Sequence, residues 1–237
     1  MDATVPIPLY HGTSTLFLPS IMEFGLGAVN PIAELRVLDF ARAIYPMVRE
    51  HIAPDRSWAS KALSFRKMVE QQSSVMNWQH GDVYLSPSRH TAIRYAVNKR
   101  VGSELLSYAL DLLQELLNRG VAGVRDELYG QFPAIFELLD VSVAPVVITV
   151  REVQPAALLD ENGNAPDMAL DFVARVCKEF VESEEILGQV NFRLREPSPP
   201  AMLTVQLICV TRYDPLAPQY RLYDVSSSAL TEQVGRR

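Results

Sequence analysis

The chain is poor in the residues that build disulfide frameworks and metal centres. Its 237 residues include two cysteines and four histidines. Cys177 belongs to a helical pattern and Cys209 to an apolar strand, so we expect both thiols to be buried, and their spacing fits no disulfide framework. The histidines are scattered along the sequence, so they provide no ligand set for a catalytic metal.

Long apolar runs and an excess of basic charge are also missing. No stretch approaches the roughly 20 apolar residues that span a bilayer, and residues 1–8 lack the basic start and apolar core of a signal peptide. These features predict a cytoplasmic protein with no membrane partner. A net charge of −6 gives no overall basic field for nucleic acid. Basic side chains do gather locally, either as an ordinary exposed helix face or as a phosphate site: Arg89, His90, Arg94, Lys99 and Arg100.

The composition is that of a folded chain. A hydrophobic content of 48% with 21% charged residues excludes a disordered protein, and this length can bury a substantial core. We expect a single domain over residues 1–237, with a helical insertion at about 30–75 and further helices at about 103–140.

Local patterns predict the order of the elements. Apolar residues recur at helical spacing in residues 31–52, where Pro46 should kink or divide the helix. Ser103 is expected to cap a later helix with an apolar stripe of leucines. Further helices are predicted at 58–72, 124–139 and 167–185, strands at 6–10, 83–85, 146–153, 190–195, 202–212 and 219–224, a loop at 73–81 and a turn at 160–163. This order predicts an α+β fold with helices inserted in a sheet-based core.

Two short motifs carry the chemical information. The first is Leu9–Thr13, Leu-Tyr-His-Gly-Thr, at the end of an extended segment and followed by helical turns that stop at Gly25. The second is Asp82–Ala96, DVYLSPSRHTAIRYA, a β-type segment followed by a helix that holds Ala92 and Tyr95. Either motif alone is weakly specific, and the pair in this order is more so.

This pair of motifs resembles the ADP-ribosyltransferase family, in its diphtheria-toxin-like and poly(ADP-ribose)-polymerase-like branch. In that branch a His-Gly strand is followed by a Tyr-Leu strand and a helix with alanine and tyrosine. The resemblance implies an ADP-ribosyltransferase-like split β-sheet core. It also implies that two small sheets form a cleft that holds NAD, the donor of ADP-ribose, in a bent and extended shape.

The resemblance implies a role for each matching residue. His11 matches the family histidine that hydrogen-bonds the adenosine ribose, and Gly12 matches the glycine whose backbone holds the nicotinamide carboxamide. Tyr84 matches the tyrosine that stacks on the nicotinamide, and Tyr95 matches the second aromatic wall.

The residue types suit these roles. A carboxamide is recognised by a main-chain donor and acceptor, and only a residue without Cβ, such as Gly12, lets the main chain come that close. A flat cationic pyridinium needs aromatic faces on both sides, which also attract its charge. Thr13 and Ala92 complete the expected set of NAD-binding residues.

The third motif departs from the family pattern. Family members carry a glutamate at the start of a late strand. The best match here is a strand followed by a proline-rich turn and a second strand, and its glutamate position holds Asn191. Asn191 is therefore predicted as a catalytic residue with His11 and Tyr84. Gln219 is a second candidate, although no long strand follows it.

Replacing glutamate by asparagine changes the chemistry. Cleavage of the nicotinamide–ribose bond passes through an oxocarbenium-like state, which a carboxylate stabilises while it takes a proton from the nucleophile. Asparagine can hydrogen-bond a ribose hydroxyl but is no base, and loss of such a group costs about 3 kcal/mol, or about a hundredfold in rate. Three alternatives follow: an inactive NAD-binding relative, transfer to a nucleophile that needs little activation, or replacement of the acid by Glu182, Glu184 or Glu185.

We therefore expect an NAD-dependent mono-ADP-ribosyltransferase that modifies a protein or a nucleic acid. Its extra helices and third position are similar to toxin or defence-type members, and a neutralising protein partner is a further expectation. One alternative is a catalytically inactive NAD- or ADP-ribose-binding module. Another is an RNA 2′-phosphotransferase-like enzyme, whose relatives tend to show arginine and histidine pairs where this chain has Tyr10-His11 and Tyr84.

Overall fold

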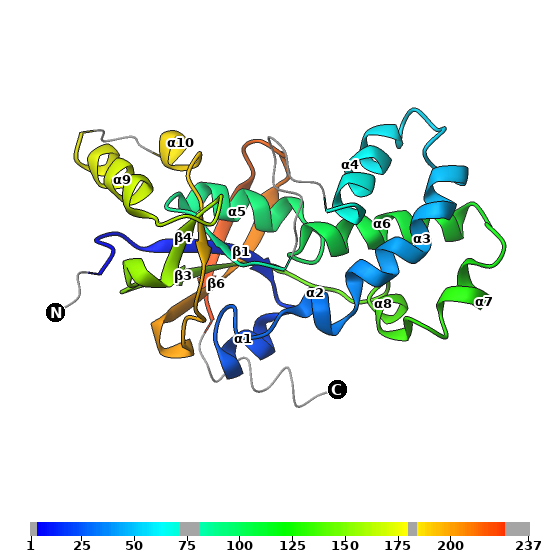
Figure 1. Cartoon of the computed structure of the whole chain (residues 1–237), viewed down its shortest axis with the longest axis horizontal. Helices are drawn as coiled ribbons and strands as arrows, with labels where there is room; N and C mark the ends of the chain where they lie inside the picture. The colour runs from blue at the N-terminus through cyan, green and yellow to red at the C-terminus, as the bar shows by residue number, and fades with distance from the viewer. Residues whose placement is uncertain (1–3, 72–80, 180–183, 226–237) are drawn as a thin grey trace. The chain divides into compact units, whose positions relative to one another are not determined.

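The computed structural model describes residues 4–71, 81–179 and 184–225. The chain divides into two compact units (Figure 1). The sheet unit comprises residues 1–29, 82–102 and 143–237, and the helical unit comprises residues 30–81 and 103–142. The protein is thus a mixed α+β protein with antiparallel sheets, which confirms the predicted class. The predicted loop at 73–81, with Trp78 and His80, lies outside the described residues except for Gly81.

The sheet unit contains two antiparallel sheets. The larger has the order β1-β3-β6-β7, built from β1 (Leu9–Ser14), β3 (Pro145–Val150), β6 (Leu203–Arg212) and β7 (Gln219–Asp224). The smaller has the order β2-β5-β4, built from β2 (Tyr84–Leu85), β5 (Phe192–Leu194) and β4 (Leu158–Asp160). Between the two sheets, Tyr10 of β1 forms a bridge with Ser86, which follows β2.

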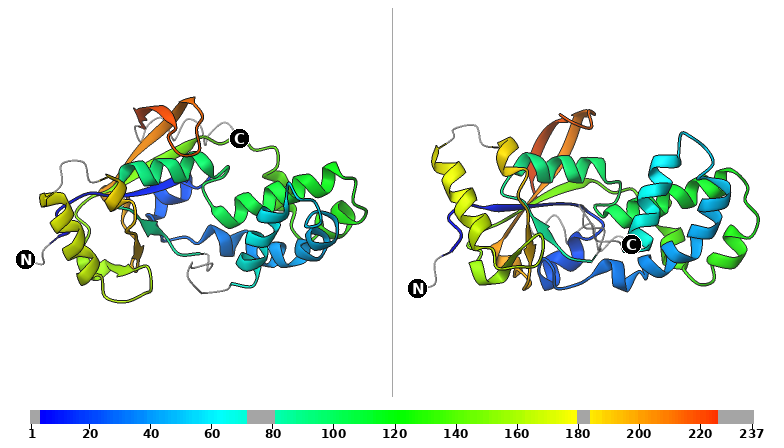
Figure 2. Two further views of the ribbon diagram at one scale, coloured as in Figure 1. Left: turned by 90° about the horizontal axis from the view of Figure 1, so that it is seen from above. Right: turned by 45° about the horizontal axis from the view of Figure 1, so that its top comes forward.

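One helix, α5 (Arg89–Asn98), packs on the larger sheet (Figure 2). It begins at Ser88, whose hydroxyl accepts the N–H of Thr91 at 3.1 Å. Its buried residues form an apolar cluster with the sheet: Ala92, Ile93, Ala96, Val147 and Ile208. The remaining helices of this unit are α1 (Leu18–Phe24), α9 (Asp167–Glu179), α10 (Glu184–Leu187) and the 3-10 turns η1 (Pro155–Ala157) and η2 (Pro200–Met202).

The first strand begins later and extends further than predicted. Pairing with β3 starts at Leu9, opposite Val150, and continues to Ser14. Pro6 and Pro8 have no N–H to donate to a strand ladder, so the regular strand starts only after them. The first motif therefore lies inside a paired strand instead of at the end of one.

The helical unit is built from two separate stretches of sequence. Its helices are α2 (Pro31–Glu34), α3 (Val37–His51), α4 (Ala59–Val69), α6 (Glu104–Asn118), α7 (Val124–Leu128) and α8 (Pro133–Glu137). The predicted cap of α6 is confirmed, because the Ser103 hydroxyl accepts the N–H of Leu106 at 3.4 Å. The leucines of its predicted stripe are fully buried.

Two predicted helices are divided differently from what we expected, and a third is described only in part. The helix at 31–52 breaks at Arg36, which has a φ of 52°, and α3 continues through Pro46. Pro46 lies on the exposed side of α3, where water can bond the carbonyl that proline leaves without a donor. The helix at 124–139 is two short helices, since Pro133 starts α8. The helix at 167–185 is described as α9 and α10.

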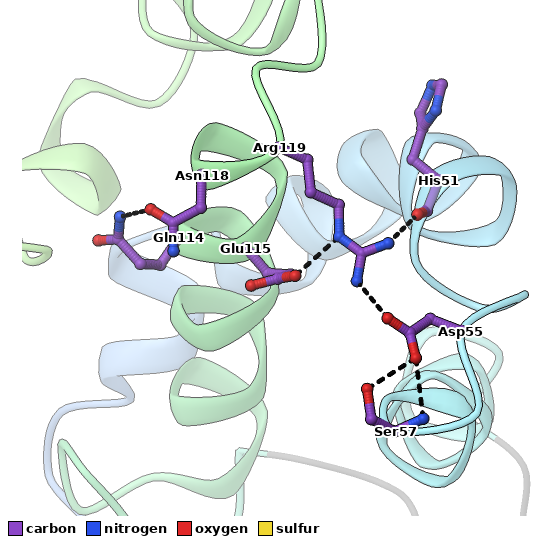
Figure 3. A network of polar contacts seen from close by, with 7 residues as sticks. All are labelled: His51, Asp55, Ser57, Gln114, Glu115, Asn118 and Arg119. Carbon is purple, nitrogen blue, oxygen red and sulfur yellow. Dashed lines mark hydrogen bonds and ion pairs between the residues drawn. The ribbon is translucent and has the colours of Figure 1, made fainter.

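Arg119 connects α6 to the segment between α3 and α4 (Figure 3). Its guanidinium donates to the main-chain oxygen of His51 at 2.6 Å, to Asp55 at 2.8 Å and to Glu115 at 2.7 Å. Asp55 also accepts the N–H and the hydroxyl of Ser57. The bonds from Ser57, followed by the one from Arg119, lower the pKa of Asp55. This network holds the α3–α4 segment on α6.

Both cysteines are exposed, so the prediction of buried thiols is wrong. Side chains alternate along β6, and Ile208 is the buried neighbour of Cys209. On α9 the residue that faces the core is Val176, one position before Cys177. No helix within the described ranges has the length and apolar character needed to cross a bilayer.

Candidate functional site

The imidazole of His11 lies between the two sheets. Its Nδ1 atom is 2.9 Å from the main-chain oxygen of Tyr84. A carbonyl oxygen only accepts, so Nδ1 carries the proton in this bond. Burial lowers the pKa of His11, against the opposing effect of the bond to Tyr84. The ring is therefore neutral at neutral pH, and its Nε2 atom is free of a proton and able to accept a hydrogen bond.

The main chain of Gly12 faces the place where the sheets separate. Tyr10 and Ser86 exchange two main-chain hydrogen bonds, each 2.8 Å long. Main-chain groups point alternately to the two edges of a strand, so the N–H and C=O of Gly12 point to the same edge as those of Tyr10. Continuing the antiparallel register puts Tyr84 opposite Gly12. The pairing stops before this point among the described residues, and Tyr84 bonds His11 instead.

Gly12 also packs directly on α5. A Cβ atom at this position would lie 1.9 Å from the main-chain oxygen of Ala92 and 3.1 Å from the main-chain nitrogen of Ala96. Both atoms belong to the helix backbone, so neither can shift without distorting α5. The structure thus gives Gly12 a packing role that the sequence analysis did not foresee, in addition to the expected approach to a ligand.

The remaining residues of the two motifs differ in accessibility. Tyr95 lies one turn after Ala92 on α5, is 37% exposed, and has the Lys99 ammonium 5.9 Å from its ring centroid. Ala92 and Thr13 are both buried. A Cβ atom at Gly102 would lie 2.7 Å from the Thr13 hydroxyl oxygen, so Thr13 faces that glycine. The side chains of Thr13 and Ala92 therefore offer a ligand much less surface than Tyr95 does.

Asn191 lies beside the second motif. Continuing the register of β5 with its neighbours puts Asn191 opposite Ser86 on one side and opposite Glu161 on the other. Directly opposed residues face the same side of a sheet, so these three side chains share one face with Tyr84. Gln219 begins β7 at the outer edge of the larger sheet. The structure therefore brings Asn191, and not Gln219, next to the two motifs.

Glu161 is a residue that the sequence analysis missed. The Asn191 amide nitrogen donates to its carboxylate at 2.5 Å. Glu161 directly follows β4. This strand has only three residues, too few to show an alternation of apolar and polar side chains in the sequence. The sequence signal in this region is that of a turn, and acidic residues are common in turns.

Of the glutamates considered as replacement acids, Glu184 contacts the second motif. Glu182 lies outside the described residues. Glu184 accepts the Ser88 hydroxyl at 2.5 Å and the His90 N–H at 3.4 Å. A carboxylate at the start of α5 suits the helix dipole, so Glu184 acts as a cap. Glu185 is exposed next to it.

Part of the expected basic cluster is engaged within the protein. Arg89 donates to Gln206, which in turn donates to Asp224 at 2.7 Å. The Nε atom of Arg89 is buried and has no hydrogen-bond partner among the described residues. Arg89 therefore packs against the larger sheet instead of forming an open helix face.

Several chemical groups lie at or beside the junction of the two sheets. The neutral imidazole of His11 and the main chain of Gly12 lie where the first motif meets Tyr84, and the Glu161 carboxylate bonded to the Asn191 amide lies beside the second motif. Over the residues that the structure describes, no three or more His, Cys, Asp or Glu side chains are grouped to hold a metal ion. Comparisons of the chain with protein-family models, with curated proteins and with solved structures find no match.

Proposed function

We propose that this protein transfers a single ADP-ribose from NAD to a nucleophile on a protein or a nucleic acid. The observation that carries the proposal is the hydrogen bond between His11 and Tyr84, which are 73 positions apart in the sequence. It joins the two motifs at the point where the two sheets separate. The split sheet and the adjacent helix α5 further support an ADP-ribosyltransferase-like fold.

Each group has a defined part in binding NAD under this proposal. The N–H and C=O of Gly12 bond the nicotinamide carboxamide. Tyr84 and Tyr95 stack on the pyridinium ring, whose positive charge is attracted by aromatic faces. The ammonium of Lys99 already lies over the Tyr95 ring, so the pyridinium takes the opposite ring face. The Nε2 atom of His11 accepts a ribose hydroxyl.

The departure at the third motif favours a second candidate function. With Asn191 in place of a glutamate, the same groups suit a module that binds NAD or ADP-ribose without cleaving it. The two functions differ in one observable product, nicotinamide, which only the transferase releases.

The experiment combines a labelled donor with two classes of acceptor. The protein is incubated with NAD labelled in its adenine, together with lysate proteins or with total RNA and DNA, and nicotinamide is measured in parallel. The variants are His11→Ala and Tyr84→Ala, with His51→Ala and Tyr223→Ala as matched controls. His51 lies in the helical unit, and Tyr223 is half exposed on β7.

The outcomes separate the functions. Macromolecular label that persists in the controls and is lost in the His11 and Tyr84 variants supports transfer. Saturable NAD binding without nicotinamide release supports the binding module instead. Release of a cyclic phosphorylated ADP-ribose from 2′-phosphorylated RNA would replace both with the RNA 2′-phosphotransferase alternative.

A further inference from the structure

We infer that Glu161 supplies the carboxylate that the third motif lacks, as the charged partner of Asn191. The inference rests on the proposed function and extends it by one residue. It assigns the negative charge of the site to the residue that follows β4, and not to the residue that precedes the neighbouring strand β5.

The position of Glu161 follows from strand register. β4 and β5 pair with Leu159 opposite Arg193 and Asp160 opposite Phe192, so the next pair is Glu161 and Asn191. Phe192 is fully buried, which means that its neighbours in β5 face the other side of the sheet. Glu161 and Asn191 thus lie on the face that carries Tyr84.

The contact between the two side chains fixes the orientation of the amide. An ionised carboxylate only accepts hydrogen bonds, so the nitrogen of Asn191 must face Glu161, at the observed 2.5 Å. The Asn191 oxygen therefore faces away from Glu161 and is available to accept a ribose hydroxyl. A carboxylate acceptor also makes this bond stronger than one between neutral groups.

A tight turn holds Glu161 in place. One carboxylate oxygen of Asp160 accepts the N–H of Asn162 at 2.9 Å and that of Asn164 at 2.7 Å. The N–H of Asp160 donates to the main-chain oxygen of Asn164 at 2.9 Å. The Glu161 side chain is exposed, and its backbone lies inside this hydrogen-bonded turn, which limits its motion relative to Asn191.

The bond between C1′ of the ribose and N1 of nicotinamide breaks, and its electron pair leaves on nicotinamide, which becomes neutral. The positive charge that develops at C1′ is stabilised by the Glu161 carboxylate and by the ribose hydroxyl bonded to Asn191. The nucleophile of the acceptor bonds C1′, and its proton passes to Glu161 and then to water.

The test separates turnover from binding. Nicotinamide release gives kcat and KM, and calorimetry gives the NAD affinity, for wild type, Glu161→Gln, and Glu161→Gln combined with Asn191→Glu. Glu137→Gln is the matched control, since Glu137 is an exposed glutamate of α8 in the helical unit. We expect Glu161→Gln to lower kcat about a hundredfold with little change in NAD affinity. The double variant, which places a carboxylate at position 191 just before β5, should recover much of the lost kcat.

Different results would overturn the role of Glu161 and the proposed transferase function. If Glu161→Gln turns over NAD as fast as wild type, or if Glu184→Gln and not Glu161→Gln loses kcat, the role of Glu161 is overturned while the transferase remains. A fall in kcat that Asn191→Glu does not rescue, accompanied by a lower melting temperature, assigns Glu161 a structural role only. A wild-type protein that binds NAD without releasing nicotinamide overturns both claims and leaves only the binding module. A wild-type protein that does not bind NAD overturns the NAD-binding module as well.

Discussion

The Nδ1 atom of His11 donates a hydrogen bond to the main-chain oxygen of Tyr84 at 2.9 Å. The backbone of the second motif thereby sets the tautomer and the orientation of the histidine in the first. Because the bond involves a carbonyl and no side chain of Tyr84, substitutions of the Tyr84 side chain and of His11 test different properties of the site.

The stability of the protein should fall in mild acid because of His11. Its pKa in the folded state is lowered by burial, whereas the unfolded chain has the ordinary value of about 6.5. As the pH drops below about 6.5, the unfolded state takes up a proton before the folded state does, so the free energy of unfolding decreases until the folded pKa is reached. Urea denaturation over this range should show a smaller decrease for His11→Gln. An identical pH dependence in the two proteins would contradict the assignment.

Gly12→Ala should destabilise the sheet unit through contact with α5. The added Cβ would lie 1.9 Å from the main-chain oxygen of Ala92, and overpacking of this kind costs about 1–3 kcal/mol. Gly130→Ala is the control, because no atom beyond its two chain neighbours lies within 4 Å of its added Cβ. Urea denaturation measures both. Equal stabilities would show that β1 and α5 do not pack as described.

Tyr84 should contribute to NAD affinity through its ring and not through its hydroxyl. We expect Tyr84→Ala to weaken binding about tenfold, since stacking on the pyridinium is worth about 1–1.5 kcal/mol. Tyr84→Phe should bind nearly as wild type. Tyr95→Ala should resemble Tyr84→Ala. Isothermal titration calorimetry with NAD measures these affinities. Wild-type affinity in both alanine variants would remove the stacking model.

Asp160→Asn should weaken the turn that carries Glu161. The hydrogen bond from the Asn164 N–H is the largest cause that lowers the pKa of Asp160. A lowered carboxyl pKa adds stability above the ordinary value of about 3.9, and this stability is lost as the pH falls through the folded pKa. Urea denaturation from about pH 7 down to pH 3 should therefore show a smaller loss in Asp160→Asn. Asp140→Asn, an exposed aspartate before β3, should leave the profile unchanged.

Arg119→Ala should loosen the helical unit locally. The variant removes the bonds to the His51 oxygen, Asp55 and Glu115. Amide hydrogen exchange in the segment between α3 and α4 should become several-fold faster, with little change in the sheet unit. Arg125→Ala, a substitution within α7, is the control. Unchanged exchange in Arg119→Ala would show that the network does not restrain this segment.

Features that depend on residues close together in the sequence were predicted well. The cap at Ser103 and the leucine stripe of α6 depend on neighbours three or four positions away, and both are confirmed. The strands β6 and β7 lie close to their predicted ranges. Pro46 does not divide α3, because its effect depends on which side of the helix faces water, a property set by the whole helical unit.

The sequence predicted the candidate site only at residues whose side-chain type restricts the chemistry they can perform. His11 and Tyr84 belong to motifs, and the structure puts them in contact. The approach of Gly12 to Ala92 and the pairing of Glu161 with Asn191 depend on strand register and on helix packing between distant segments. Register between short strands leaves no pattern in the sequence, so neither contact was foreseen.

The helical unit interrupts the sheet unit twice, at residues 30–81 and at 103–142. No contiguous fragment can therefore include β1, β2 and β5 without also including both helical stretches. A protein reduced to the sheet unit would have to be made by replacing each helical stretch with its own short linker, because trimming the ends of the gene could never produce it.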